Sequence, residues 1–164
     1  MRHLIILRHA KSSWSNPDVS DFDRPLNKRG KRSAKALGLW LKEKGMVPDA
    51  ALVSSARRAR ETWDRLGFAD LTPDVRRELY LAEPETLLDA LQDSTAQTTL
   101  ILAHNPGIAA LSHDLVDTPP DHPRFDDFPT GAMLIVKFAG NGPIELGTGE
   151  VVSFVTPHDL TETE

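Results

Sequence analysis

The chain of 164 residues contains no cysteine. Disulfide bonds and thiolate chemistry are therefore excluded, and the composition fits a reducing compartment. No apolar stretch approaches the roughly 20 residues that span a membrane. A secretory signal peptide is not expected either, because charge follows at once after a short apolar run near the first residue. These absences predict a cytoplasmic protein that does not act at a membrane.

Motifs for metals and nucleotides are also missing. The six histidines never form a His-x-His, His-x-x-x-His or His-Glu-x-x-His pair, so the sequence predicts no metal site and no cofactor. Neither a Walker loop nor a Gly-x-Gly-x-x-Gly pattern occurs. The net charge of −5 argues against general nucleic-acid binding.

Short apolar runs alternate with amphipathic segments, which is typical of an α/β protein with a mostly parallel sheet and helices on both faces. The apolar runs predict buried strands at residues 3–8, 50–53 and 98–103, and late strands, antiparallel at an edge, at 131–138 and 150–155. The amphipathic segments predict helices at residues 28–44, 56–66, 84–92 and 106–116. The proline-rich segment 118–129 predicts a long loop. We expect one domain over residues 1–156 and a polar tail over 157–164.

Polar residues follow three of the expected strands. Arg8 and His9 come after the first strand, Ser54 after the second and His104 after the strand at 98–103. Because ligands bind beyond the carboxyl ends of parallel strands, we expect these side chains to share one site. A guanidinium and an imidazole at that edge suit a bound anion.

Four sequence blocks in order resemble the histidine phosphatase superfamily, and within it the SixA-type phosphohistidine phosphatases. The first block is the strand that ends in Arg8-His9, and the second is the segment 24–30, Arg-Pro-Leu-Asn-Lys-Arg-Gly. The third is the segment 54–62, Ser-Ser-Ala-Arg-Arg-Ala-Arg-Glu-Thr, and the fourth is 104–106, His-Asn-Pro. Ala10 and Ser55 stand where many members have glycine and proline. The resemblance implies the phosphoglycerate-mutase-like fold, a three-layer sandwich around a mostly parallel sheet.

The resemblance also implies a role for each polar residue. His9 is the expected nucleophile, because a neutral imidazole nitrogen can attack phosphorus, and nearby arginines are expected to lower its pKa. Arg8 and Arg58 are the expected phosphate clamp, and counting from Ser54 selects Arg58 over its neighbours Arg57 and Arg60. His104 is expected to donate a hydrogen bond to a phosphoryl oxygen, and Lys11 is a further candidate phosphate contact.

The sequence does not select a proton donor for the leaving group. The candidates are acids that flank the second block or surround Tyr80, namely Asp21, Asp23, Glu78 and Glu83. A phosphohistidine substrate needs less help from an acid, because imidazole is a better leaving group than an alkoxide. The absence of an acid at a diagnostic spacing therefore favours phosphohistidine.

We interpret the chain as a metal-independent phosphatase that acts through a phosphohistidine intermediate on His9, with phosphohistidine on a protein as substrate and a role in signal transduction. One alternative is a small-molecule phosphomonoesterase or phosphosugar mutase of the same superfamily, and another is a non-catalytic phosphate-binding module. The segment from Arg24 to Lys44 carries eight basic residues and one acid. This surplus has two interpretations, a solvated helix face or a surface that steers an acidic phosphorylated partner.

Overall fold

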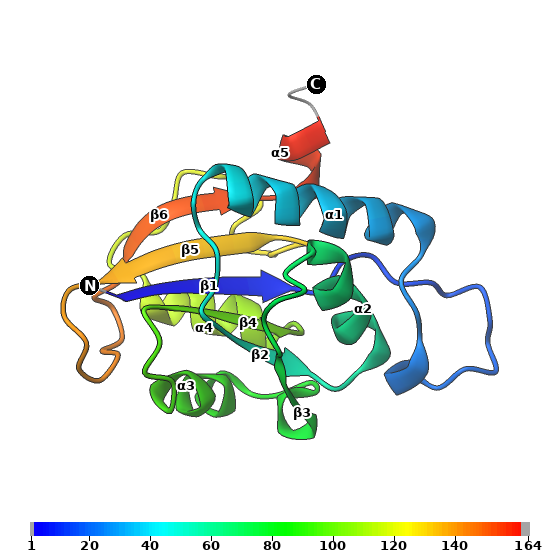
Figure 1. Ribbon diagram of the computed structural model, residues 1–164, viewed down its shortest axis with the longest axis horizontal. Coiled ribbons are helices and arrows are strands. Elements are labelled where there is room, and N and C mark those ends of the chain that lie inside the picture. Colours follow the sequence, from blue (N-terminus) through cyan, green and yellow to red (C-terminus); the bar gives the residue numbers. More distant parts are fainter. Residues whose placement is uncertain (1, 162–164) are drawn as a thin grey trace.

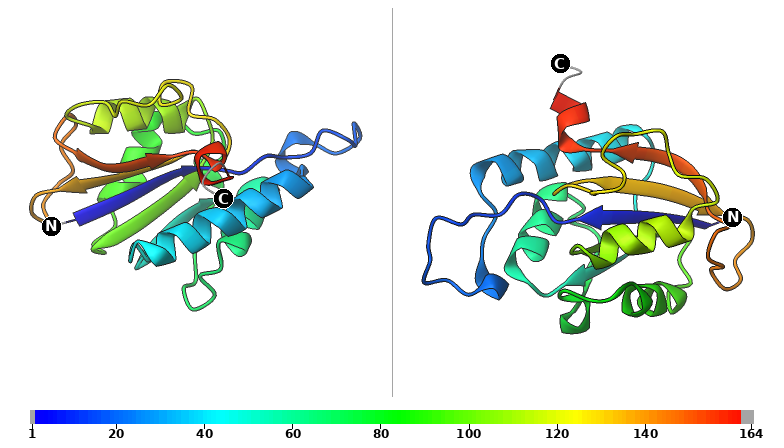
Figure 2. Two further views of the ribbon diagram at one scale, coloured as in Figure 1. Left: turned by 90° about the horizontal axis from the view of Figure 1, so that it is seen from above. Right: turned by 180° about the vertical axis from the view of Figure 1, so that it is seen from behind.

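The computed structural model describes residues 2–161 and shows a six-stranded sheet with helices on both faces (Figures 1 and 2). The strands are β1 (Arg2–Arg8), β2 (Ala50–Ser54), β3 (Asp74–Arg76), β4 (Thr98–Ala103), β5 (Met133–Phe138) and β6 (Glu150–Val155). The helices are α1 (Lys28–Glu43), α2 (Arg57–Leu66), α3 (Pro84–Gln92), α4 (Gly107–Leu115) and α5 (Pro157–Thr161), with short 3-10 turns at Asp21–Asp23 and Arg77–Leu79. None of the helices between residues 2 and 161 is long and apolar enough to cross a lipid bilayer.

The strands lie in the order β3-β2-β4-β1-β5-β6. β1, β4, β2 and β3 are parallel, whereas β5 and β6 are antiparallel additions at one edge. The fold is the mixed α/β sandwich that the sequence predicts, and the late strands are antiparallel at an edge as expected. The carboxyl ends of β1, β2 and β4 therefore meet at one edge of the sheet.

Successive side chains of a strand point to opposite faces of the sheet, and each face carries its own hydrophobic core. In β1, Leu4 and Ile6 face the side that α3 and α4 cover, whereas Ile5 and Leu7 face α1 and α2. All four side chains are at most 1% exposed. A strand buried on both faces reads as a continuous apolar run, which is why the central strands are recognisable from the sequence.

Glycines allow α1 to lie close to its neighbours. The side chain of Asn27 accepts a hydrogen bond from the Gly30 amide and so caps the helix. A Cβ on Gly30 would lie 2.1 Å from the carbonyl oxygen of Lys11, and one on Gly38 would lie 1.9 Å from that of Leu66. The first contact fixes the segment that follows β1 against the start of α1.

Four local features differ from the sequence-based expectation. β3 and the two 3-10 turns were not predicted, because each spans only three residues. Part of the expected polar tail is α5, which packs against α1, while residues 162–164 lie outside the described residues. Ser54 and Ser55 precede α2 and belong to a residue type that favours helix caps, but Ala56 is the N-cap residue. Asn105 is likewise of a residue type that favours helix caps, but Pro106 is the N-cap residue of α4.

Candidate active site

A cavity of about 210 Å³ lies beyond the carboxyl ends of β1 and β4, and we call it the strand-end cavity. Its lining includes the residues that the sequence predicts for phosphate binding and catalysis, namely Arg8, His9, Lys11, Arg58 and His104. The imidazole rings of His9 and His104 face each other with centroids 5.1 Å apart. The topology thus brings together side chains from three distant parts of the chain.

The hydrogen bonds of His9 determine its tautomer. Its Nδ1 lies 2.7 Å from the carbonyl oxygen of Ala10, and since a carbonyl only accepts, Nδ1 carries the proton. Its Nε2 accepts from the Nε of Arg58 at 3.3 Å, so this nitrogen keeps the lone pair. The amide of Ala10 in turn donates to the hydroxyl of Thr62 at 3.0 Å, which anchors the turn. The ring therefore presents an unprotonated nitrogen to the strand-end cavity.

Burial is the main cause that keeps His9 neutral. The side chain is almost fully buried, and this burial is the largest cause that lowers the pKa of His9 well below its usual range. The neighbouring His104 is the second cause. Arg58 and Arg8 lower the pKa further. The arginines do lower the pKa of His9, as the sequence predicts, and burial of the ring beneath the strand-end cavity adds a larger effect that the sequence does not reveal.

His104 has one engaged and one unpartnered nitrogen. Its Nε2 lies 2.8 Å from the hydroxyl of Ser54, which also accepts from the amide of Ala56. The direction of that hydrogen bond depends on the tautomer of His104, and the other ring nitrogen, Nδ1, is a buried atom without a hydrogen-bond partner in residues 2–161. Burial, followed by the charge of Arg58, lowers the pKa of His104 to about 3, so the ring is neutral. A buried polar atom without a partner costs about 1–3 kcal/mol.

The two predicted clamp arginines have different surroundings. Arg58 is 3% exposed and contacts Asp21 twice, through the Asp21 carbonyl at 2.6 Å and its carboxylate at 3.1 Å. Arg8 donates to the carbonyl of Phe128 at 3.1 Å, whereas its buried Nε has no partner within the described chain. Arg58 is thus held against His9, and Arg8, which also lines the strand-end cavity, keeps a buried Nε without a hydrogen-bond partner within the described chain.

The neighbours of Arg58 point away from the strand-end cavity. Arg57 is half exposed and pairs with Glu61 at 2.9 Å, and Arg60 donates to the carbonyl of Ser55 on the surface. Neither side chain lines the strand-end cavity. Of these three arginines, Arg58, which counting from Ser54 selects, is the one that lines the strand-end cavity, and its role as a phosphate clamp stays a prediction.

The four candidate acids do not line the strand-end cavity. Asp21 contacts Arg58, and although burial acts in the opposite direction, hydrogen bonds from Tyr80, Arg58 and Arg24 hold the pKa of Asp21 at about 2. Asp21 is consequently a carboxylate and not a loaded proton donor. The other three lie elsewhere: Asp23 accepts from Ser20, Glu78 pairs with Arg76, and Glu83 precedes α3.

Sequence reasoning missed three side chains around the site. Arg24 lines the strand-end cavity and donates to Ser12 and Asp21, and its place in the 24–30 block was an available signal. Trp14 is largely exposed and stacks on Arg24, with 3.5 Å between the guanidinium carbon and the ring centre. The hydroxyl of Tyr80 donates to Asp21, and its ring edge meets His104. No local pattern marks Trp14 or Tyr80.

No group of three histidine, aspartate or glutamate side chains within residues 2–161 is arranged to hold a metal ion. The positively charged groups that line the strand-end cavity are protein side chains, among them Arg8, Arg24 and Arg58.

The lowered pKa values of His9 and His104 predict how these two rings respond to a fall in pH. Because the folded pKa values of His9 and His104 lie below the ordinary value near 6.5, we expect the rings to stay unprotonated as pH falls from 8 to 5. Imidazole proton resonances, assigned with His9→Ala and His104→Ala, measure this directly. Protonation of either ring above pH 5 would contradict this expectation. The free energy of unfolding should also fall below pH 6.5, because the unfolded chain then binds protons that the folded rings do not.

Comparison with known proteins gives one consistent result. Residues 4–83 match the model of the histidine phosphatase superfamily, branch 1. An uncharacterized protein of Mycobacterium leprae is 33% identical, with 92% of this chain and 99% of the relative covered. An uncharacterized protein of Mycobacterium tuberculosis is also 33% identical, with the same coverage.

The solved structures agree with the sequence match. A SixA protein from Nakamurella multipartitia, named as a candidate phosphohistidine phosphatase, superimposes with a TM-score of 0.80 at 29% identity, covering 95% of this chain and 96% of that one. The protein histidine phosphatase SixA complexed with tungstate gives a TM-score of 0.78 at 25% identity, covering 96% and 99%. The family model matches, the mycobacterial relatives align over nearly their whole length, and the SixA structures share the architecture. The chain therefore belongs to the histidine phosphatase superfamily, as a phosphatase of the SixA-type branch.

Proposed function

We propose that this phosphatase removes phosphate from phosphohistidine on a protein, without a metal ion, through a phosphoryl group carried on His9. The observation that carries the proposal is the unprotonated Nε2 of His9, held beside Arg58 in a cavity that Arg8 and His104 also line. A nucleophile and three charge-stabilising groups are the parts that phosphoryl transfer requires.

The reaction has two steps. In the first, the lone pair of His9 Nε2 forms a bond to phosphorus while the bond from phosphorus to the substrate imidazole breaks. The substrate ring enters protonated on its other nitrogen, so it takes the electron pair and leaves as neutral imidazole without needing an acid from the enzyme. In the second, a water oxygen attacks the phosphoryl group on His9, the nitrogen–phosphorus bond breaks, and the water protons pass to phosphate and solvent. Arg8, Arg58 and His104 hold the non-bridging oxygens in both steps, because their donors suit the charge on those oxygens.

Two observations support phosphohistidine over an alkyl phosphate. None of the four candidate acids lines the strand-end cavity, and Asp21 is ionised, so the described residues present no evident proton donor for an alkoxide. An imidazole leaving group needs such a donor least. The second observation is the likeness to SixA structures, whose names state phosphohistidine or protein histidine phosphatase.

A substrate panel tests the proposal. The enzyme is given a phosphohistidine-bearing protein, a phosphoserine peptide, an aryl phosphate and a phosphosugar, and kcat/KM is compared. We expect the phosphohistidine protein to give the highest value. A phosphosugar that is hydrolysed faster would indicate a small-molecule phosphomonoesterase, a phosphosugar converted to its isomer would indicate a mutase, and no turnover of any compound would indicate a binding module.

Exhaustive chelation is expected to leave the rate unchanged. The arginines at the strand-end cavity supply the positive charge that a metal would otherwise provide. The measurement is kcat/KM after dialysis against EDTA, with and without added Mg²⁺ or Zn²⁺. A loss of activity that a metal ion restores would overturn the metal-independent mechanism.

We further propose that the enzyme works in the cytoplasm on a signalling protein. The cysteine-free composition supports this placement, and a protein-borne phosphohistidine supports the signalling role.

A further inference from the structure

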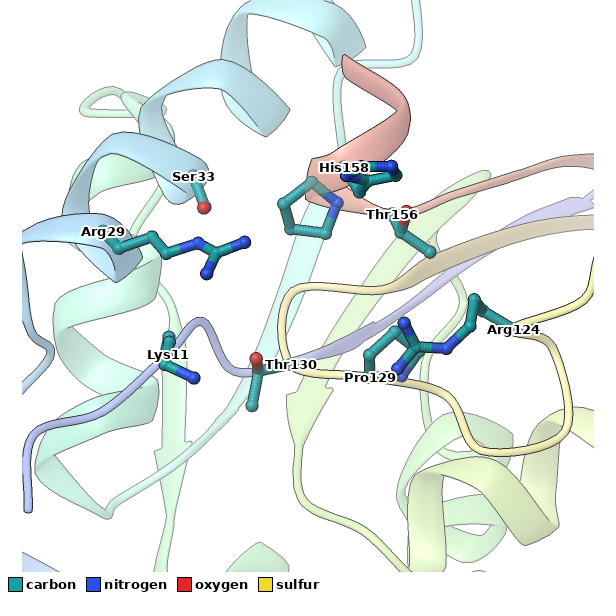
Figure 3. Close-up of a pocket in the computed structure, with 9 residues that line it drawn as sticks. Lys11, Arg29, Ser33, Arg124, Pro129, Thr130, Thr156 and His158 are labelled. Atoms are coloured by element: carbon teal, nitrogen blue, oxygen red, sulfur yellow. The ribbon is translucent and has the colours of Figure 1, made fainter. Parts of the chain in front are cut away.

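A second cavity of about 230 Å³ adjoins the strand-end cavity, and we call it the basic cavity (Figure 3). Its cationic lining comes from three segments: Lys11 after β1, Arg29 in the first turn of α1, and Arg124 in the long loop before β5. Lys11 and Thr130 line both cavities. The two cavities therefore lie side by side, with these two residues at their common border.

The positive charge of the basic cavity is only partly neutralised. Arg124 pairs with Asp127 at 2.8 Å, whereas Lys11 and Arg29 form no ion pair within residues 2–161. No carboxylate lines the basic cavity. The adjacent acid Asp159 is engaged by His122 and by the amide and hydroxyl of Thr156. Two cations thus face the basic cavity without a counter-charge.

Close backbone packing holds the walls of the basic cavity in place. The amide of Asn27 donates to the carbonyl of Lys11 at 3.0 Å, and the missing Cβ of Gly30 lets α1 touch that same carbonyl. On the opposite wall, Gly131 has a φ of +77° and leaves room for Pro157, which would lie 2.6 Å from an added Cβ. The segments that carry Arg29, Lys11 and Thr130 are therefore fixed relative to one another, which favours a pre-formed site.

The side chains in Figure 3 show what such a site can hold. The guanidinium of Arg29 extends from α1 toward the centre of the basic cavity, and that of Arg124 extends toward it from the opposite side. The hydroxyls of Ser33 and Thr130 add polar groups to the lining, whereas the hydroxyl of Thr156 donates to Asp159. Cationic forks with nearby hydroxyls recognise carboxylate and phosphate oxygens.

We propose that the basic cavity binds a second anionic group, a carboxylate or a phosphate, of the molecule whose phosphoryl group occupies the strand-end cavity. This inference deepens the proposed function, on which it rests for the site of reaction. On a phosphoprotein the group would be an acidic side chain beside the phosphohistidine, and on a small ester it would be a second phosphate. The basic cavity would then select substrates with two neighbouring anionic groups.

The test uses matched substrates that differ only in the second anion. One pair is a phosphohistidine peptide with a neighbouring Glu or Gln, and the other is an alkyl bisphosphate and its monophosphate. Each compound is measured as a substrate and as a competitive inhibitor of aryl phosphate hydrolysis, with the wild type, Arg29→Gln, Arg29→Lys and the control Lys35→Gln. Lys35 is an exposed cation on the same helix that does not line the basic cavity, so the control removes the same net charge.

We expect Arg29→Gln to raise KM or the inhibition constant about tenfold for at least one compound with a second anion, with kcat unchanged. The matched compound without that anion and the aryl phosphate should be unaffected, Arg29→Lys should recover part of the affinity, and Lys35→Gln should behave as the wild type. Equal changes for both members of each pair, or no change in either pair, would overturn the proposal. An effect of Arg29 on the bisphosphate while the phosphopeptide is not hydrolysed would retain the basic cavity and reject the phosphohistidine function.

Discussion

The substitution His9→Ala is expected to lower kcat by about 10⁴-fold or more while the fold is retained. Removing a covalent nucleophile produces losses of this order, because the remaining groups can only bind and polarise the substrate. The side chain lies at the strand-end cavity and its own bonds are few, one to the carbonyl of Ala10 and one from Arg58. Its loss therefore enlarges an existing cavity rather than opening a new one in the core.

Two measurements check this result beyond the rate. Wild-type enzyme quenched during turnover of a ³²P-labelled substrate should carry an acid-labile, base-stable label, and His9→Ala should carry none. Circular dichroism and thermal unfolding check the fold, and His113→Ala is the matched control because its ring pairs with Asp126 on the surface. Turnover by folded His9→Ala at a rate near that of the wild type would refute the covalent mechanism.

The sequence predicts the central fold well because its signals are local. The runs that form β1 and β4 are buried on both faces, so they appear as uninterrupted apolar segments. Helix α3 was predicted with its observed bounds, since Pro84 marks its first turn. In contrast, β3 is a three-residue edge strand with two exposed residues, and only its pairing with β2 defines it. No pattern within three residues carries that information.

The candidate site likewise has features that the sequence predicts and contacts that it does not reveal. His9 and His104 follow directly from the strands that precede them, because parallel strands end at one edge. The tautomer of His9 depends on the carbonyl of Ala10 and on Arg58, which is 49 residues away in the chain. The contact between Asp21 and Arg58 spans 37 residues. Spacing along the chain cannot reveal such contacts, and so the acid candidates remained open at the sequence level.

The substitution Arg58→Ala is expected to lower kcat/KM by about 10²–10³-fold, whereas Arg57→Ala and Arg60→Ala should stay close to the wild type. The loss of one donor that stabilises transition-state charge typically has this magnitude. Arg58 also donates to Nε2 of His9 and so orients the nucleophile before substrate binds. Arg57 and Arg60 carry the same guanidinium group as Arg58 but hold it in a different place. Their side chains donate on the surface, to Glu61 and to the carbonyl of Ser55 respectively.

The stability of the variants must be separated from their activity. Removing the buried guanidinium leaves the carboxylate of Asp21 without its Arg58 partner, so Arg58→Ala should unfold at a lower temperature than the wild type. Arg58→Lys keeps a positive charge near Asp21 but loses the planar fork, and it should restore more of the stability than of kcat/KM. Rates are therefore compared well below the unfolding temperature of each variant. Similar, mild losses at positions 57, 58 and 60 would show that Arg58 is not the clamp, even though it is the arginine that the structure places against His9.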